Sequence, residues 1–103
     1  MILPTLIGYL NLTAFNADNL PTKVCNSLQQ KLNNNNVNVN ATPVYGASYN
    51  TFVGCELTAN KSTLNTASKI IKNKVIVNLR SGYKITSSEF TVNNTLFVFV
   101  SAL

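Results

Sequence analysis

The side chains that could carry chemistry are few and widely spaced in this chain. Among 103 residues there are no histidines, and the three acids are Asp18, Glu56 and Glu89. Histidine is the commonest general base and metal ligand, so its absence removes the usual centre of both kinds of site. A paired-carboxylate mechanism would require the three acids to converge in space. We therefore expect a protein without catalysis, with no catalytic residue, bound metal or cofactor.

The two cysteines, Cys25 and Cys55, have two outcomes open to them. With no histidine and few acids beside them, they make neither a zinc site nor an activated nucleophile. Cys25 falls on the apolar side of a predicted helix and Cys55 within a predicted strand, so both should be buried. They are either two reduced core thiols or, if their Cα atoms come within about 7 Å, a disulfide.

Positive charge is concentrated in the second half of the chain. The net charge is +5, and six of the eight cations lie between residues 61 and 84. A basic stretch of this kind is typical either of a solvated helix face or of a phosphate-binding surface. The scarcity of arginine, the preferred bidentate phosphate ligand, favours the solvated face. The nucleic-acid alternative would use the cations Lys69, Lys72, Lys74, Arg80 and Lys84.

The first half of the chain predicts a strand, a helix and a second strand. Residues 4–14 are rich in β-branched and aromatic types, which favours a strand. Asp18 or Asn19 can then cap a helix with Pro21 in its first turn, and the run of asparagines at 33–36 can end it. Within that helix, apolar residues recur every fourth position and form one stripe: Leu20, Val24, Leu28 and Leu32. Residues 37–45 alternate between apolar and polar types, as in a strand with one wet face.

The second half repeats this order. Residues 49–59 predict a strand, and Ser62 or Thr63 is expected to cap a second helix with Gly82 at its C-terminal end. Residues 83–91 and 95–102 predict two further strands around a turn at Asn93 and Asn94. The apolar stripe expected on the second helix consists of Leu64, Ala67, Ser68, Ile71 and Val75.

The two halves also resemble each other in sequence. Ile7-Gly8-Tyr9 matches Val53-Gly54-Cys55 at an offset of 46 residues, and Leu12-Thr13-Ala14 matches Leu57-Thr58-Ala59 at an offset of 45. The order of elements predicts an α+β fold: a ferredoxin-like β-α-β-β-α-β two-layer sandwich with an extra C-terminal strand. We expect a single domain over residues 1–103, made of two duplicated halves, 4–45 and 49–102.

The C-terminal strand is the most suggestive candidate for a binding surface. Leu96, Phe97, Val98, Phe99 and Val100 show no polar alternation, so both faces of this strand call for burial. In a two-layer fold the helices cover only one face of the sheet. Either another chain covers the second face, or the strand lies at an edge that accepts an added strand. We predict self-association or capture of an extended peptide along this strand or in a groove between the halves.

Nucleic-acid binding is the rival hypothesis. The helix-free face of the sheet could present aromatic rings for base stacking, as in sheet-surface RNA-binding proteins. The candidate rings are Tyr9, Tyr45, Tyr49, Tyr83 and Phe90. No run of alternating basic and aromatic residues typical of those proteins is present, so this hypothesis ranks second.

The asparagine-rich, charge-poor composition, together with the echoed Ile/Val-Gly-Tyr/Cys and Leu-Thr-Ala segments, resembles small orphan proteins of filamentous viruses of thermophilic archaea. Those proteins are built from two similar motifs flanking a groove. The resemblance implies a protein-interaction role without catalysis, and it assigns no site residues. The 17 asparagines depart from the composition usual in heat-adapted proteins, which favour lysine and glutamate.

The expected location follows from two further features of the sequence. The longest apolar run, residues 96–100, is far shorter than the ~20 residues that a membrane helix needs. The apolar N-terminal residues have no cation before Lys23, so they do not look like a signal peptide. We expect a soluble intracellular protein, in the host cell if it is viral, with a protein or peptide partner or a second copy of itself.

Overall fold

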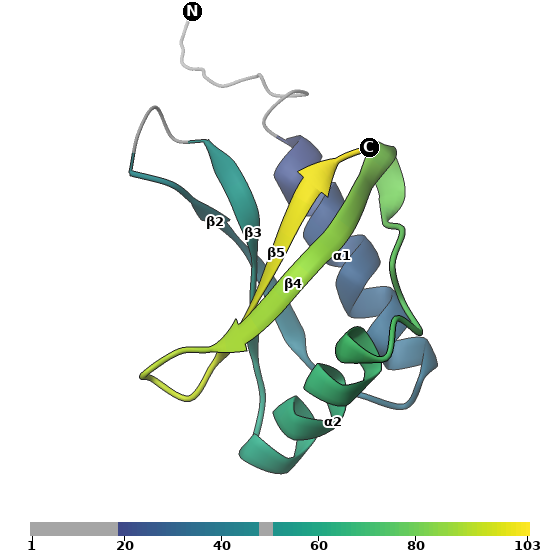
Figure 1. The fold of residues 1–103 in the computed structure, drawn as a ribbon, viewed down its shortest axis with the longest axis vertical. Coiled ribbons are helices and arrows are strands. Elements are labelled where there is room, and N and C mark those ends of the chain that lie inside the picture. Colours follow the sequence, from purple (N-terminus) through teal and green to yellow (C-terminus); the bar gives the residue numbers. More distant parts are fainter. Residues whose placement is uncertain (1–18, 48–50) are drawn as a thin grey trace, which may run out of the picture.

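The computed structural model describes residues 19–47 and 51–103. Within them the chain is an α+β structure of two helices and a four-stranded antiparallel sheet (Figure 1). The predicted strand over 4–14 and the first part of that over 49–59 lie outside the described residues. The elements follow in the order α1 (Asn19–Asn34), β2 (Asn40–Tyr45), β3 (Phe52–Thr58), α2 (Lys61–Lys72), a short 3₁₀ turn at Arg80–Gly82, β4 (Tyr83–Phe90) and β5 (Leu96–Ala102).

The strands lie in the order β2-β3-β5-β4, and every neighbouring pair is antiparallel. The last strand of the chain is therefore an inner strand, paired with β3 on one side and β4 on the other. An edge position for residues 96–100, one of the two alternatives that the sequence left open, is wrong. Strand β5 is hydrogen-bonded on both sides, and the outer strands among the described residues are β2 and β4.

Both helices lie on the same face of the sheet (Figure 1). Helix α1 begins and ends where its sequence predicts, and its apolar stripe is buried at Val24, Leu28 and Leu32 and partly buried at Leu20. Two polar side chains of α1 fasten it to neighbouring elements: Gln29 Oε1 accepts a hydrogen bond from the Ala41 backbone N–H at 2.9 Å, and Ser27 Oγ accepts one from the Arg80 N–H at 3.3 Å. The asparagine run ends the helix as expected, with Asn36 in the left-handed conformation at φ 66°.

Helix α2 is shorter than predicted at its C-terminal end. Its cap is Asn60, whose Oδ1 accepts hydrogen bonds from the Thr63 N–H and the Ser62 hydroxyl, each at 2.9 Å, so the expected capping residues Ser62 and Thr63 lie in the first turn instead. The helix ends at Lys72 and not near Gly82. The β-branched run that begins at Val75 resists helical packing, and Val75 itself is 60% exposed.

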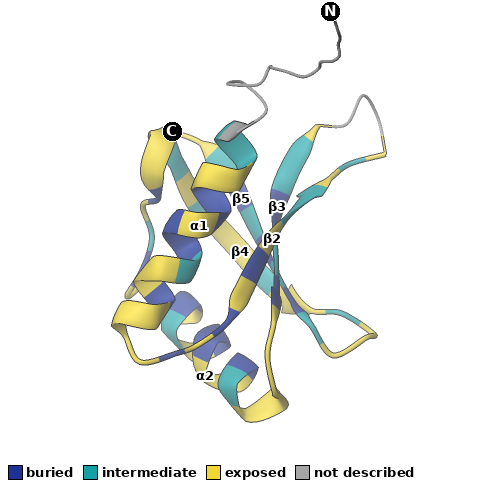
Figure 2. Cartoon of the chain, turned by 180° about the vertical axis from the view of Figure 1, so that it is seen from behind, coloured by how far each residue is buried: buried dark blue, intermediate teal, exposed yellow. Residues whose placement is uncertain are grey.

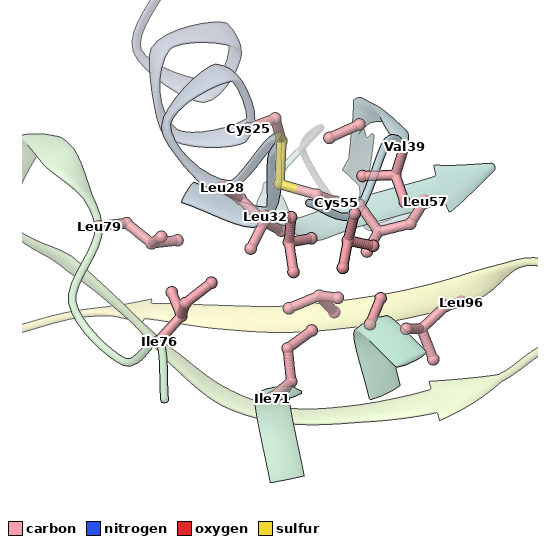
Figure 3. Packing of buried hydrophobic residues seen from close by; sticks show 14 of the residues in the cluster. Cys25, Leu28, Leu32, Val39, Cys55, Leu57, Ile71, Ile76, Leu79 and Leu96 are labelled. Atoms are coloured by element: carbon pink, nitrogen blue, oxygen red, sulfur yellow. A yellow bond between two sulfur atoms is a disulfide. The ribbon is translucent and has the colours of Figure 1, made fainter. Parts of the chain in front are cut away.

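The core lies between the helices and the sheet, where Figure 2 shows the buried residues gathered. The alternation of β5 directs Leu96, Val98 and Val100 into this core. The loop after α2 adds Ile76 and Leu79, which take the inward place expected of Val75. Figure 3 shows the side chains of both helices meeting those of the central strands in one continuous cluster.

Cys25 and Cys55 form a disulfide at the centre of this core (Figure 3). Their sulfur atoms are 2.08 Å apart and their Cα atoms 5.7 Å apart, which is within the range that a disulfide needs. Both residues are fully buried. Of the two outcomes that the sequence left open, the structure has the bonded one, and it ties α1 to β3.

Candidate interaction surface

The helix-free face of the sheet carries an aromatic pair at its centre. Phe97 and Phe99 stand on β5 with their ring centroids 4.5 Å apart and their planes 19° from parallel. Both rings remain partly exposed, and no other described element covers this face. We call this surface, with the residues that flank the pair, the open sheet face.

Gly54 makes room for this pair. It lies opposite Phe99 in the register between β3 and β5. A Cβ at position 54 would meet the Val98 carbonyl oxygen, and would lie 2.9 Å from a ring carbon of Phe97. The Phe97 ring thus covers the bare backbone of β3, so that part of its apolar surface is used within the fold.

Charged residues surround the aromatic pair in a defined order. The register places Glu56 of β3 and Glu89 of β4 on either side of Phe97, and Lys84 of β4 beside Ser101. Glu56 is partly buried, and its Oε2 accepts a hydrogen bond from the Thr95 hydroxyl at 2.8 Å. Lys84 and Glu89 are exposed, and they lie to either side of the Ser87–Phe99 pair.

The five residues predicted to bind a partner are thus divided between two environments. Leu96, Val98 and Val100 belong to the core of this single chain and are not available to a partner. Phe97 and Phe99 lie on the open sheet face, where a partner can reach them. The sequence run is uniformly apolar because one of its faces packs on the helices and the other carries the aromatic pair.

The cations of the nucleic-acid hypothesis do not form one surface. Lys69 and Lys72 lie on α2 and Lys74 just after it, whereas Arg80 lies in the 3₁₀ turn beside α1 and Lys84 on the open sheet face. All five are exposed. The first three are therefore grouped at one end of α2, and the last two are not part of that group.

The aromatic rings of the same hypothesis are not on the open sheet face either. Tyr83 pairs with Ala102 on the helix side and contacts the Phe52 ring edge-on. The Phe52 ring in turn lies against Tyr45 at a tilt, so the three rings form a row at the end of the sheet. Phe90, opposite Leu96, also faces the helix side and is 43% exposed. Tyr9 and Tyr49 lie outside the described residues. The interpretation that these rings would line the helix-free face is wrong for those that are described.

The acids do not gather within the described part of the chain. Glu56 and Glu89 are separated by β5, and Asp18 lies outside the described residues. No group of three or more histidine, cysteine or acidic residues that could hold a metal ion occurs in residues 19–47 and 51–103.

One feature escaped the sequence reasoning: a small cleft along the outer edge of β4. Its volume is about 240 Å³, and it lies between the C-terminal end of α2, the loop that follows and β4. The Ser88 hydroxyl in this cleft is buried without a hydrogen-bond partner. Nothing in the sequence marks Ser88, because its orphan hydroxyl results from the meeting of a helix and a strand.

The fold and surface define a two-layer α+β protein with one covered and one open sheet face. Comparison of this chain with protein families, curated proteins and solved structures finds no match. In the described residues, no helix is both long and apolar enough to span a bilayer.

Proposed function

We propose that the protein is an interaction module that self-associates through its open sheet face. The observation that carries this proposal is the partly exposed Phe97–Phe99 pair at the centre of a sheet face that no described element covers. Aromatic residues in the middle of a surface, ringed by polar groups, are typical anchors of protein interfaces.

The order of charges on this face supports a second copy as the partner. Lys84 and Glu89 lie at matching distances on either side of Ser87 and Phe99, because their partners on β5 are Ser101 and Phe97. A two-fold axis through the Phe99 position, parallel to the sheet and across the strands, would bring Lys84 of each copy over Glu89 of the other. The face is then self-complementary, as a symmetric dimer requires.

The internal duplication predicted from the sequence, of halves 4–45 and 49–102, forms part of the proposal, and the order of the described elements supports it in part. Each helix is followed by a hairpin, and the strands related by the 46-residue offset, β3 and β5, pair at the centre of the sheet. We infer a duplicated α-β-β unit in which β5 takes the position that the first strand holds in a ferredoxin-like sandwich.

The first test is the molar mass in solution by light scattering and sedimentation. We expect wild type to show a concentration-dependent dimer and Phe99→Lys to be a monomer, since a buried unpaired ammonium opposes the contact. Val92→Lys is the matched control, because Val92 is 97% exposed at the tip of the β4–β5 hairpin. A monomeric wild type would contradict the proposal.

A charge exchange tests the symmetric arrangement itself. Lys84→Glu and Glu89→Lys should each weaken the dimer by about tenfold, because each places like charges opposite one another. The double variant should return to within about threefold of wild type, since it restores both pairs. A double variant as weak as the sum of the two single variants would show that these residues do not face each other.

Nucleic-acid binding stays as the alternative, with Lys69, Lys72 and Lys74 as its remaining common surface. Binding of a single-stranded oligonucleotide that weakens steeply with salt would favour it.

A further inference from the structure

The outer edge of β4 is open over only part of its length. At the beginning of the strand, the segment Val77–Leu79 pairs with it: the Leu79 N–H donates to the Tyr83 carbonyl and the Ile85 N–H donates to the Val77 carbonyl, each at 2.8 Å. Beyond the irregularity between Ile85 and Ser87, no described residue pairs with the outer side of the strand. The backbone from Ser87 to Phe90 therefore offers unused donors and acceptors.

The cleft described above lies against this edge. Its apolar lining comes from Ile71 at the end of α2, Ile76 in the following loop and Ile85 on β4. Ile71 and Ile76 are buried members of the core, so the floor of the cleft is fixed by the packing of the domain. A volume of about 240 Å³ has room for one side chain of a ligand, but not for a large cofactor.

The orphan hydroxyl of Ser88 indicates a missing hydrogen-bond partner at the same place. Its oxygen is buried and makes no hydrogen bond within the protein. Buried polar atoms are almost always paired, because each unpaired one costs the free energy of its lost hydration. A polar ligand atom in the cleft would satisfy it.

Glu89 of the same strand lies on the opposite, open sheet face, and the charged residues on the helix side, around the cleft itself, are of one sign. Lys72 and Lys74 line it, and Lys69 is on the preceding turn of α2. Between residues 61 and 80 the chain contains five cations and no acid. An approaching acidic ligand is therefore favoured and a basic one opposed.

We infer that this cleft and the free edge of β4 bind an extended acidic peptide, which adds as a strand beside Ser87–Phe90. One apolar side chain of the peptide enters the cleft over Ile71, Ile76 and Ile85. Acidic side chains two positions away, which lie on the same face of the peptide strand, meet Lys72 and Lys74. The free backbone edge is the reason to favour a peptide over an oligonucleotide, since strand addition uses main-chain hydrogen bonds. No aromatic ring lines the cleft to stack a base.

The test uses a fluorescein-labelled heptapeptide in which serines alternate with a glutamate, a valine and a second glutamate, so that the valine and both glutamates share one face when the peptide is extended. This valine–glutamate peptide is followed by fluorescence anisotropy and by amide shifts in nuclear magnetic resonance spectra. We expect binding that shifts the amide signals of residues 86–90 and that weakens about tenfold in Lys72→Glu/Lys74→Glu. Lys61→Glu, at the other end of α2, is the matched control and should bind like wild type. The same heptapeptide with lysine in place of both glutamates should not bind.

Two further arms separate strand addition from general charge attraction. A peptide N-methylated at alternate residues keeps its charge but loses the backbone N–H donors along one of its two edges. Methylation at the odd or at the even positions gives two phases, and one of these two peptides should lose binding. Equal binding of both phases, or insensitivity to the lysine substitutions, would overturn the inference. A 12-nucleotide single strand that competes for the same lysines with higher affinity would also overturn it, in favour of nucleic acid.

The site does not depend on the proposed dimer. The Phe99→Lys protein should therefore bind the valine–glutamate peptide as wild type does, whether or not self-association is found. Folding of every variant is checked by its thermal transition. If Lys72→Glu/Lys74→Glu has an altered transition, Lys72→Gln/Lys74→Gln replaces it and should still weaken binding.

Discussion

At the scale of single residues, two positions stand out: one has no room for a side chain, and the other holds a buried hydroxyl without a partner. Gly54 lies where any Cβ would meet the Val98 carbonyl and the Phe97 ring, and Ser88 places a hydroxyl where the fold supplies no partner. The first is a requirement of the sheet itself. The second lowers the stability of the isolated chain, and is the kind of feature that a binding site retains.

Gly54→Ala is expected to destabilise the protein by about 2–3 kcal/mol, because the added methyl group forces strand β5 or the Phe97 ring to move. Urea unfolding followed by circular dichroism measures the change. Gly46→Ala serves as the control, since its Cβ would meet only ordinary contacts, the nearest at 3.5 Å from Val53. Equal stability of the two variants would show that β3 and β5 are not packed as described.

Ser88→Ala is expected to leave stability unchanged or to raise it by about 1 kcal/mol, since it removes a buried hydroxyl without a partner. The same unfolding measurement tests this expectation. A loss of stability would mean that the hydroxyl has a partner in the folded protein.

At the scale of elements, the disulfide is the main link between the two layers. It joins α1 to β3 across a sequence separation of 30 residues. The hydrogen bonds that Gln29 and Ser27 accept from the backbone N–H groups of Ala41 and Arg80 hold the same helix at two further points. Helix α1 is therefore fixed along its length, whereas α2 is held mainly by its apolar stripe.

Removing the disulfide with Cys25→Ala/Cys55→Ala is expected to lower the free energy of unfolding by about 3–4 kcal/mol, because the unfolded chain regains the freedom of a loop of that length. Thermal unfolding with and without a reducing agent checks this. The reductant should lower the transition of wild type and leave that of the double variant unchanged. If the reducing agent leaves the thermal transition of wild type unchanged, even after the protein has been unfolded in its presence, the two cysteines are not bonded.

At the scale of the whole molecule, the distribution of charge distinguishes the two faces. The open sheet face holds both described acids, Glu56 and Glu89, and one cation, Lys84, whereas the lysines of the two helices lie on the other side. Association through the open sheet face should therefore depend only modestly on salt, since its charges are mixed. Peptide binding at the edge of β4 should weaken strongly as salt rises.

Sedimentation and anisotropy at about 50 mM and 500 mM sodium chloride would measure both effects on the same protein. The dimer constant is expected to change by no more than about threefold, and the affinity for the valine–glutamate peptide to fall by at least about tenfold. A large salt effect on the dimer and a small one on peptide binding would show that the two surfaces have been assigned wrongly.

The sequence predicts most of the described elements, because their patterns are local. The four-residue apolar spacing predicts α1, and the turn at Asn93 and Asn94 separates β4 from β5 as expected. The C-terminal limit of α2 is missed, since helix propensity alone does not show where a β-branched run will leave the helix. The cap is placed two or three residues late because Asn60, Ser62 and Thr63 are all suitable capping residues.

The arrangement of the strands and the candidate sites was less accessible. That β5 lies between β3 and β4 depends on long-range pairing, which leaves no mark in the apolar pattern of residues 96–100. From that pattern an edge position was one of two alternatives and all five residues were predicted to bind a partner, yet only Phe97 and Phe99 of the five face outward. The cleft beside Ser88 required the relative positions of α2 and β4, which no local pattern contains.

The inner position of β5 also determines the order in which the domain can be completed. Strand β4 precedes β5 in the chain, yet β3 and β4 are each hydrogen-bonded to β5 and not to each other. Without β5, the described pairings leave the β2–β3 hairpin on one side, and on the other a β4 that pairs only with the segment Val77–Leu79. Pairing of β5 therefore connects the β2–β3 hairpin to β4. We expect that a chain shortened before Leu96 would not form the four-stranded sheet.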